Sequence, residues 1–288
     1  MTEKAAAAPA VPAALLSAFR DTLVLFALTG AIWLLHVYGR TLPSLVLAAA
    51  WAALTAIIAW GLFKRARIRR AAFLLAYVEP SSPLSRCLRG GFIMAAHAGL
   101  LAAALALVLM LAVIRLADGA AWVVLVVSAP AFVLTRALAA RVFGRHARRG
   151  YLPELAWRTT AAVVGAFMFA ALVWLAFHRS YPALGGVGLD QAVWHFVDAE
   201  QARSAWVGIL LKIAAAKDGL RLWLAEQLMP RPGASLVQAA GWLIVLAEDA
   251  VFVWSYLLLY GGVLVSGRGA ASRGRRAVEK AQAGALER

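Results

Sequence analysis

Long apolar runs recur along this chain, and each is long enough to cross a lipid bilayer as a helix. The most C-terminal run covers Gly241–Val265 and is apolar except for the adjacent Glu248 and Asp249. A bilayer core of about 30 Å needs about 20 helical residues at a rise of about 1.5 Å each. Hydrophobic residues make up 63% of the chain, against roughly 45–50% in soluble domains. The predicted class is therefore an all-α, polytopic membrane protein.

We expect six transmembrane helices, at residues 19–38, 44–63, 91–114, 121–143, 159–178 and 238–265. Turn signals at 39–43 and 117–120 join the first four runs in pairs, so the prediction is three membrane hairpins. Residues 1–18 and 267–288 are then tails outside a membrane domain that covers 19–266. The second tail is rich in arginine.

The net charge of +15 comes mainly from the segments that flank the apolar runs. This distribution is typical of topology signals and argues against a nucleic-acid partner. The positive-inside rule places the basic segments and both termini in the cytoplasm. Abundant arginine and alanine indicate a bacterial source, so the predicted location is the bacterial inner membrane. Seven arginines are candidates for docking anionic lipids or acidic partners: Arg65, Arg67, Arg69, Arg70, Arg145, Arg148 and Arg149.

The less apolar region 179–235 is predicted to stay outside the membrane. If residues 205–228 crossed it, the basic C-terminal tail would lie on the wrong side. One broad helical face of this region is apolar and includes Trp206, Ile209, Ile213, Leu220, Trp223 and Leu224. An amphipathic helix on the outer membrane surface fits this pattern. A helix packed on the external ends of the spans fits equally well, and a partner-binding surface is a third interpretation.

The pair Glu248 and Asp249 is the first candidate functional site, because carboxyls inside a membrane span need partners or water. Arg136 is the basic residue deepest inside a predicted span, and Pro130 interrupts the same helix. We expect Arg136 to pair with one of the two carboxyls. The second carboxyl is then protonated, exposed to water or bound to a cation. The alternatives for this charge network are an ion pair that fixes helix register, a proton or ion relay, and a site for a lipid or another subunit.

Two rows of small residues predict close helix packing, within the chain or between chains. Gly91, Ala95, Gly99 and Ala103 recur every four residues, and Gly241, Ser255 and Gly262 lie with Glu248 on one face of the last span. A homo-oligomer is left open by this pattern.

His36 and His178 end two spans at the same predicted leaflet and could ligate a haem or a metal. Interfacial anchoring explains both residues without a ligand, so we expect no metal and no cofactor. The single cysteine, Cys87, excludes an internal disulfide. Nucleotide-binding and hydrolase motifs are absent from the sequence.

Three functions remain as hypotheses. The first is a non-enzymatic subunit of a larger bacterial membrane assembly for secretion, conjugation or energy transduction, with lipids and other membrane subunits as partners. The second is a small transporter or proton-coupled channel that uses Glu248, Asp249 and Arg136. The third is a redox protein with His36 and His178 as haem ligands.

Overall fold

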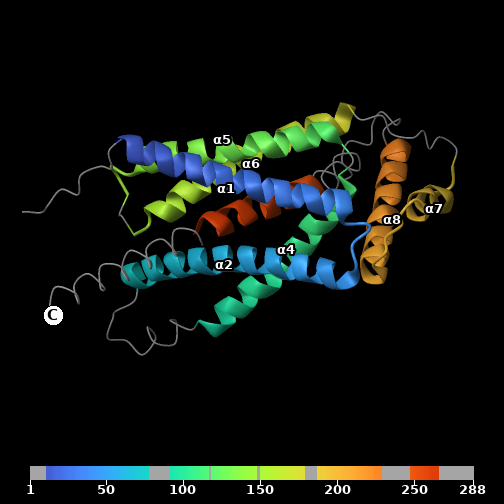
Figure 1. Cartoon of the computed structure of the whole chain (residues 1–288), viewed down its shortest axis with the longest axis horizontal. Helices are drawn as coiled ribbons and strands as arrows, with labels where there is room; N and C mark the ends of the chain where they lie inside the picture. The colour runs from blue at the N-terminus through green and yellow to red at the C-terminus, as the bar shows by residue number, and fades with distance from the viewer. Residues whose placement is uncertain are drawn as a thin grey trace, which may run out of the picture.

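The computed structural model describes residues 11–77, 91–116, 118–147, 150–178, 187–228 and 247–265, and within them every regular element is an α-helix. The elements are α1 (Val11–Tyr38), α2 (Ser44–Tyr77), α4 (Phe92–Arg115), α5 (Gly119–Phe143), α6 (Leu152–His178), α7 (Leu189–Asp198), α8 (Ala205–Leu228) and a C-terminal helix that is described over Ala247–Val265. Figure 1 shows the long helices side by side as a bundle, with α7 and α8 at one of its ends.

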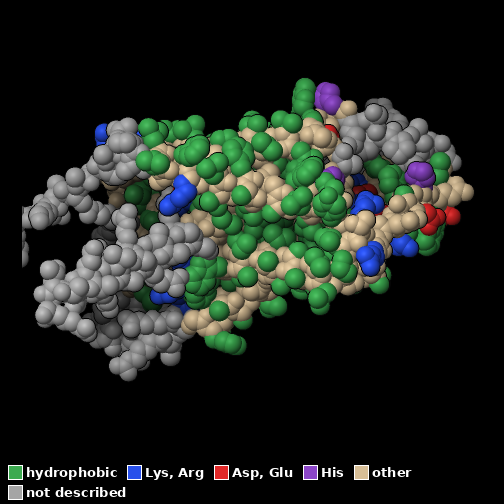
Figure 2. All heavy atoms as spheres, viewed as in Figure 1, with side chains coloured by type: hydrophobic (Ala, Val, Ile, Leu, Met, Phe, Trp, Pro, Cys, Tyr) green, Lys and Arg blue, Asp and Glu red, His purple; other side chains and the backbone are tan. Residues whose placement is uncertain are grey.

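Six of the described helices are long and apolar enough to cross a membrane, which is the predicted number. They cover Leu15–Tyr38, Ser44–Leu74, Phe92–Arg115, Gly119–Phe143, Leu152–Ala176 and Ala247–Val265. Hydrophobic side chains cover the middle of the bundle, and charged side chains gather toward its ends (Figure 2). The chain is a multi-pass membrane protein. Helix α8 is not one of the six and lies across the end of the bundle (Figure 1).

Two helices continue well beyond the limits that hydropathy predicts. Helix α2 continues past residue 63, through its run of basic residues, to Tyr77, and α6 begins at Leu152 rather than at 159. Arginine and lysine end contact with lipid, but both are good helix formers. Hydropathy therefore marks the end of the lipid-facing segment and not the end of the helix.

The C-terminal helix lies at the centre of the bundle (Figure 1). Over an apolar stretch of 18 residues, 61% of the residues of this helix are buried, against 22–39% in the equivalent stretches of the other five candidate spans. Its core residues Tyr256, Leu257 and Tyr260 are almost completely shielded. The other spans therefore pack around this helix, which follows all of them in the sequence.

The expected three hairpins are not confirmed as packing units. The closest helix pairs are α2 with α4 and α5 with α6, and α1 packs against α4 and α5. Helices α1 and α2 are joined by a short turn, yet they make hardly any close contact with each other, and the same holds for α4 and α5. The short turns bring helix ends together, but the most extensive interfaces lie between α2 and α4 and between α5 and α6, which longer connections join.

Small residues allow the C-terminal helix to touch α2 backbone to backbone. A Cβ atom added at Gly61 would lie 2.9 Å from the Cα of Gly262, and one added at Gly262 would clash with the backbone of Ile57. Ser255, from the same predicted row, is fully buried. Gly241 lies outside the described residues. The close packing predicted at Gly262 is therefore present within one chain.

The other predicted row of small residues, on α4, has a different environment. A Cβ atom at Gly91 or Gly99 would meet no atom within 4 Å, and Ala95 is exposed. At Ala103 the backbone carbonyl accepts a hydrogen bond from Trp51 at 3.0 Å. The buried alanines of α4 are Ala98, Ala102 and Ala106, one position before Gly99 and Ala103, so the buried ridge is turned by about 100°. Packing of the predicted row against another chain stays a prediction.

Helices α7 and α8 pack on each other and close one end of the bundle. They cross at Gly219, where an added Cβ atom would lie 2.9 Å from the Cα of Val193. Helix α8 contacts α2 and α4, and it buries Val207, Leu211 and Ala215. Leu211 lies opposite the face that the sequence predicts to be apolar.

The predicted apolar face of α8 is largely exposed instead. Ile209 is 60% and Ile213 is 61% exposed. Helix α8 carries apolar residues on more than one side, so the amphipathic prediction is not confirmed. The alternative of a helix packed on the ends of the spans describes the observed contacts.

A substitution at Gly262 tests the backbone contact. We expect Gly262→Ala to destabilise the folded protein by about 1–3 kcal/mol, because the new methyl group forces α2 and the C-terminal helix apart. Thermal unfolding in detergent measures the effect. Gly99→Ala is the matched control and should cost nothing, since a Cβ atom fits there without contact. Equal effects of the two substitutions would show that the contact at Gly262 is not tight.

Candidate functional sites

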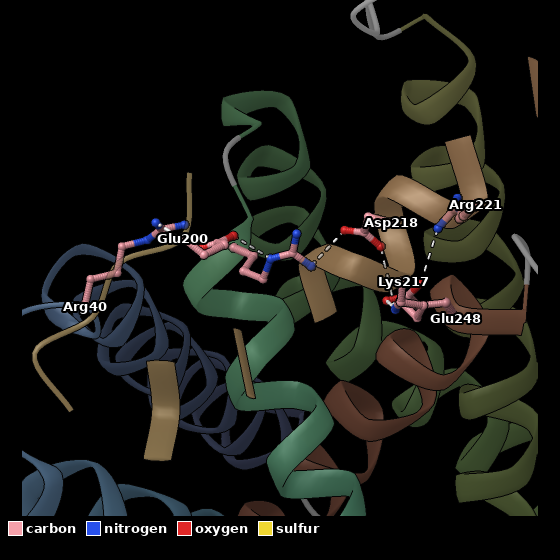
Figure 3. A network of polar contacts seen from close by, with 7 residues as sticks. Arg40, Glu200, Lys217, Asp218, Arg221 and Glu248 are labelled. Carbon is pink, nitrogen blue, oxygen red and sulfur yellow. Dashed lines mark hydrogen bonds and ion pairs between the residues drawn. The ribbon is translucent and has the colours of Figure 1, made fainter. Parts of the chain in front are cut away.

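The first candidate site is a chain of ion pairs at the α7/α8 end of the bundle, here called the α8 network. It consists of Arg40, Arg115, Glu200, Lys217, Asp218, Arg221 and Glu248, and Figure 3 shows it. Arg115, the last residue of α4, lies at its centre. Its Nε donates to Glu200 Oε1 at 2.9 Å, and its Nη1 lies 2.7 Å from Asp218 Oδ2 on α8.

Glu248 joins the C-terminal helix to α8. Its two carboxylate oxygens face Lys217 Nζ, in a short contact, and Arg221 Nη1 at 3.3 Å. Lys217 also lies 3.7 Å from Asp218, so the network is continuous from Arg115 to Glu248 (Figure 3). Two cations hold this one carboxylate, which offsets the cost of placing it at the end of an apolar helix.

The structure therefore pairs Glu248 with α8 and not with Arg136, the partner that we expected. The charge of Arg136 acts on Arg65, which packs against Gly261. Residues 248 and 261 are about 20 Å apart along a helix, so Glu248 and Arg136 belong to opposite ends of the bundle. The sequence places both residues inside spans but does not reveal that α8 lies over the end of the last span. Asp249 and Arg136 each take part in polar or electrostatic interactions. Because Asp249 adjoins Glu248, the same distance along the helix separates it from the end of the bundle to which Arg136 belongs.

The α8 network is partly buried and is anchored to the α1–α2 turn. Glu200 is 7% exposed, and Arg40 Nη1 lies 3.0 Å from its Oε2 without the alignment of a hydrogen bond. The backbone N–H of Arg203 donates to the carbonyl of Arg40 at 2.9 Å, and the hydroxyls of Ser44 and Ser204 are 2.9 Å apart. These contacts hold the segment before α8 against the bundle.

The second candidate site is a hydroxyl cluster, formed by Thr29, Ser128, Tyr256 and Tyr260, inside the bundle. The hydroxyls of Thr29 and Tyr256 are 2.8 Å apart, those of Thr29 and Tyr260 are 2.9 Å apart, and the two tyrosine hydroxyls are 2.8 Å apart. Ser128 on α5 adds a longer contact of 3.5 Å to Tyr260. All four side chains are buried. The cluster links α1, α5 and the C-terminal helix.

Sequence analysis did not identify this cluster. The available signal was the pair Tyr256 and Tyr260, one helical turn apart in the last span, together with single hydroxyl residues in two other spans. Thr29 and Ser128 also donate to carbonyls in their own helices, so each hydroxyl is satisfied even without a neighbour. A sequence pattern cannot show which of these hydroxyls meet.

The third candidate site surrounds Arg65 on α2 and is called the Arg65 site. It consists of Arg65, Arg69, Glu154, Trp157 and Arg158. The Arg65 guanidinium lies over the ring of Trp157, 4.0 Å from its centroid. Glu154 on α6 is 3% exposed; its Oε1 accepts from Arg158 at 3.1 Å and lies 3.7 Å from Arg69.

The other arginines proposed to dock lipids or partners are more exposed than Arg65. Arg67 and Arg145 are exposed, whereas Arg70 is half-buried. Arg148 and Arg149 lie outside the described residues. The sequence places Arg65 in a basic surface segment, but the fold turns its side chain inward.

The two histidines considered for haem have separate surroundings. His36 Nδ1 lies 3.0 Å from the carbonyl of Val113, and its ring contacts Trp122. His178 Nδ1 lies 2.8 Å from the carbonyl of Trp174, and its ring packs on that indole. Within the described part of the chain, no group of three or more His, Cys, Asp or Glu residues is arranged to hold a metal.

Comparison of the chain with protein families, with curated proteins and with solved structures gave no match. The geometry of the three sites is therefore the basis for a functional proposal. In the first site the described charges hold helices together, and in the second the hydroxyls satisfy one another. Glu200 Oε2 of the first site has no aligned hydrogen bond, but Arg40 lies 3.0 Å from it. In the Arg65 site, by contrast, two nitrogens of a buried cation have no hydrogen-bond partner, and cations outnumber carboxylates by three to one.

Removing Arg115 tests the α8 network. We expect Arg115→Gln to destabilise the protein by about 3 kcal/mol, since it leaves buried Glu200 without its best cation. Thermal unfolding and protease sensitivity of α8 measure this effect. Arg40→Gln, on the same carboxylate but 41% exposed, should cost less than about 1 kcal/mol. Similar losses for both variants would argue against a central role for Arg115.

A double-mutant cycle tests the hydroxyl cluster. Thr29→Val and Tyr256→Phe each remove one hydroxyl and keep the side-chain volume nearly constant. We expect a coupling free energy of about 0.6 kcal/mol, the average for hydrogen bonds between membrane helices, from unfolding in detergent. The control cycle pairs Thr29→Val with Ser255→Ala, because Ser255 bonds only its own helix at Val251 in the described contacts. Its coupling should be zero.

Proposed function

We propose that this protein is a non-enzymatic subunit of a larger membrane assembly in the bacterial inner membrane, such as a secretion, conjugation or energy-transducing complex. The observation that carries the proposal is the pairing of Glu248 with Lys217 and Arg221. Glu248, an acidic residue in the last apolar span, is the feature of the sequence most suggestive of transport. Its carboxylate, however, pairs with two cations of α8 and so has a structural role. The ion pairs at this end hold α8, with α7 packed on it, against the end of the bundle; these two helices are here called the α7/α8 platform.

Exposed apolar side chains on this platform support a docking role. Trp194 on α7 is 60% exposed, and Ile209 and Ile213 on α8 are exposed to the same degree. Large apolar side chains exposed on helices other than the six candidate spans are typical of a protein or membrane contact. We propose another membrane subunit as the main partner of this face and lipids as the partner of the spans.

The orientation belongs to the same proposal. The positive-inside rule supports a cytoplasmic location for the Arg65 end, with both termini there, and an external location for α7 and α8. The exposed arginines Arg67 and Arg145 would then lie beside anionic headgroups, where each gains about 1 kcal/mol. Acidic partner proteins are the alternative ligands of these residues.

A small proton-coupled transporter is the second candidate, and the hydroxyl cluster is the observation that favours it. The C-terminal helix carries a carboxylate at one end and two tyrosine hydroxyls in its buried middle. Linked hydroxyls can pass protons when water connects them to titratable groups. A redox function with His36 and His178 has no comparable support. A Soret band in the purified protein would establish it.

Neutralising Glu248 separates assembly from transport. We expect Glu248→Gln to lower the thermal midpoint and to reduce co-purification of partner subunits from mild detergent, because α8 loses its contact with the C-terminal helix. Proton flux in vesicles should be the same for Glu248→Gln as for the original protein. A variant that stays folded with its partners bound but loses flux would establish the transporter instead. Asp249→Asn is tested in parallel.

A matched variant examines the docking face alone. Ile209→Ser combined with Ile213→Ser changes exposed side chains and should leave the free energy of unfolding within about 0.5 kcal/mol of the original value. Partner co-purification should nevertheless fall. Lys212→Gln, an exposed substitution on the same helix, is the control and should retain the partners. Unchanged co-purification in the double variant would reject α8 as the docking face.

A further inference from the structure

Arg65 is the only buried basic side chain among the residues that the structure describes, with 6% of its surface exposed. It lies on α2 just after Lys64, where the apolar part of that helix gives way to its basic run. Such a change from apolar to basic residues is typical of the boundary between hydrocarbon and headgroups. Burying a cation there is costly unless an acceptor neutralises it.

Protein covers one face of the Arg65 guanidinium and also lies close to its terminal nitrogens. Trp157 covers one face at 4.0 Å. Two glycines make room for the guanidinium, since a Cβ atom at Gly261 would lie 2.7 Å from Nη1 and one at Gly61 would lie 3.0 Å from Nη2. Any larger residue at these two positions would displace the guanidinium. The fold therefore holds the group in a fixed plane.

The edge of the same guanidinium is not bonded. Arg65 Nη1 and Nη2 are both buried and neither has a hydrogen-bond partner. Glu154 attracts Arg65 electrostatically, but it does not come within hydrogen-bonding distance of either atom. The guanidinium is therefore held in place with two unsatisfied terminal nitrogens, and arginine uses such a pair of donors to bind a carboxylate or phosphate in a bidentate manner.

An acceptor with no donor lies in the same site. Glu154 Oε1 is taken by Arg158 and Arg69, whereas Oε2 is buried without a partner. A ligand that satisfied the whole site would accept hydrogen bonds at Arg65 and donate one at Glu154. A phosphate group that carries or adjoins a hydroxyl has both properties.

The charges of the site favour an anion. Glu154 is the one carboxylate in it, and Arg65, Arg69 and Arg158 are three cations. The charge of Arg136 adds repulsion on Arg65. An incoming anion relieves this repulsion, which a water molecule cannot do.

We propose that the Arg65 site binds a phosphate-type anion with a neighbouring hydroxyl group. Arg65 binds two phosphate oxygens through Nη1 and Nη2, Trp157 holds the guanidinium plane, and Glu154 Oε2 accepts from the hydroxyl. The source is either the headgroup of an anionic lipid such as phosphatidylglycerol or free hydrogen phosphate. The site lies at the opposite end from α8 and does not depend on the docking function proposed above.

Thermal unfolding of the purified full chain, depleted of lipid and followed by tryptophan fluorescence, tests the proposal. The probes are sodium phosphate against sodium chloride at equal ionic strength, and short-chain phosphatidylglycerol against phosphatidylcholine, whose headgroup has no hydroxyl donor. We expect phosphate or phosphatidylglycerol to raise the midpoint of the original protein, and chloride and phosphatidylcholine to have no effect. A response to phosphatidylglycerol alone identifies a lipid site, and a response to phosphate identifies a site open to solution.

Arg65→Gln should weaken the apparent affinity for the effective probe by about tenfold or more, equivalent to one charge-assisted hydrogen bond. Lys212→Gln, which removes an exposed cation at the opposite end of the bundle, should respond as the original protein does. An equal response of both variants would overturn the proposal, and so would a midpoint that neither phosphate nor phosphatidylglycerol changes.

Native mass spectrometry covers the case in which Arg65→Gln does not fold. The original protein, incubated with each probe, should retain a phosphate-bearing adduct after the detergent has been removed. Arg65→Lys keeps the charge but loses the bidentate contact, and it should retain less of the adduct than Lys212→Gln does. If the original protein retains no adduct with either probe, the site does not bind phosphate.

Discussion

The packing of the C-terminal helix against its neighbours is the constraint on which the rest of this structure depends. In lipid the hydrophobic effect does not drive helices together, so close packing and hydrogen bonds must do so. This helix provides both. Gly262 lets α2 approach backbone to backbone, and Tyr256 and Tyr260 bond Thr29 of α1. Helices that are neighbours in sequence, such as α1 and α2, are held apart because each packs on other partners.

The charges of the protein are separated along this central helix. Glu248 at one end is held by α8, and Gly261 and Gly262 at the other end leave room for Arg65. Each end therefore has a different electrostatic character. The α8 network contains three carboxylates and four cations that lie in contact with one another, whereas the Arg65 site has one carboxylate for three cations. The first arrangement supports a structural platform, and the second leaves a positive charge for a ligand.

Some parts of the fold could be predicted because they depend on local composition. Six apolar runs are sufficient to predict six spans. The turn signal at 117–120 marks the boundary between α4 and α5, where Asp118 caps α5 by accepting from the N–H of Ala120 at 2.8 Å. Gly262 was predicted as a close-packing position from its spacing with Ser255. Other features were missed because they depend on distant contacts. The partner of Glu248 comes from α8, and the expected Gly99 ridge faces open space while Ala98 and Ala102 are buried.

The sequence by itself determined that the chain crosses the membrane repeatedly and where its basic segments lie, since the cost of burying charge in lipid acts on each segment separately. Only the tertiary structure decided which helices touch and which polar groups are satisfied. Arg65 and Arg67 are two residues apart in one basic run, yet one is buried against Trp157 and the other is exposed. Their difference arises from the side of α2 that meets α6 and the C-terminal helix, and no local pattern specifies that side.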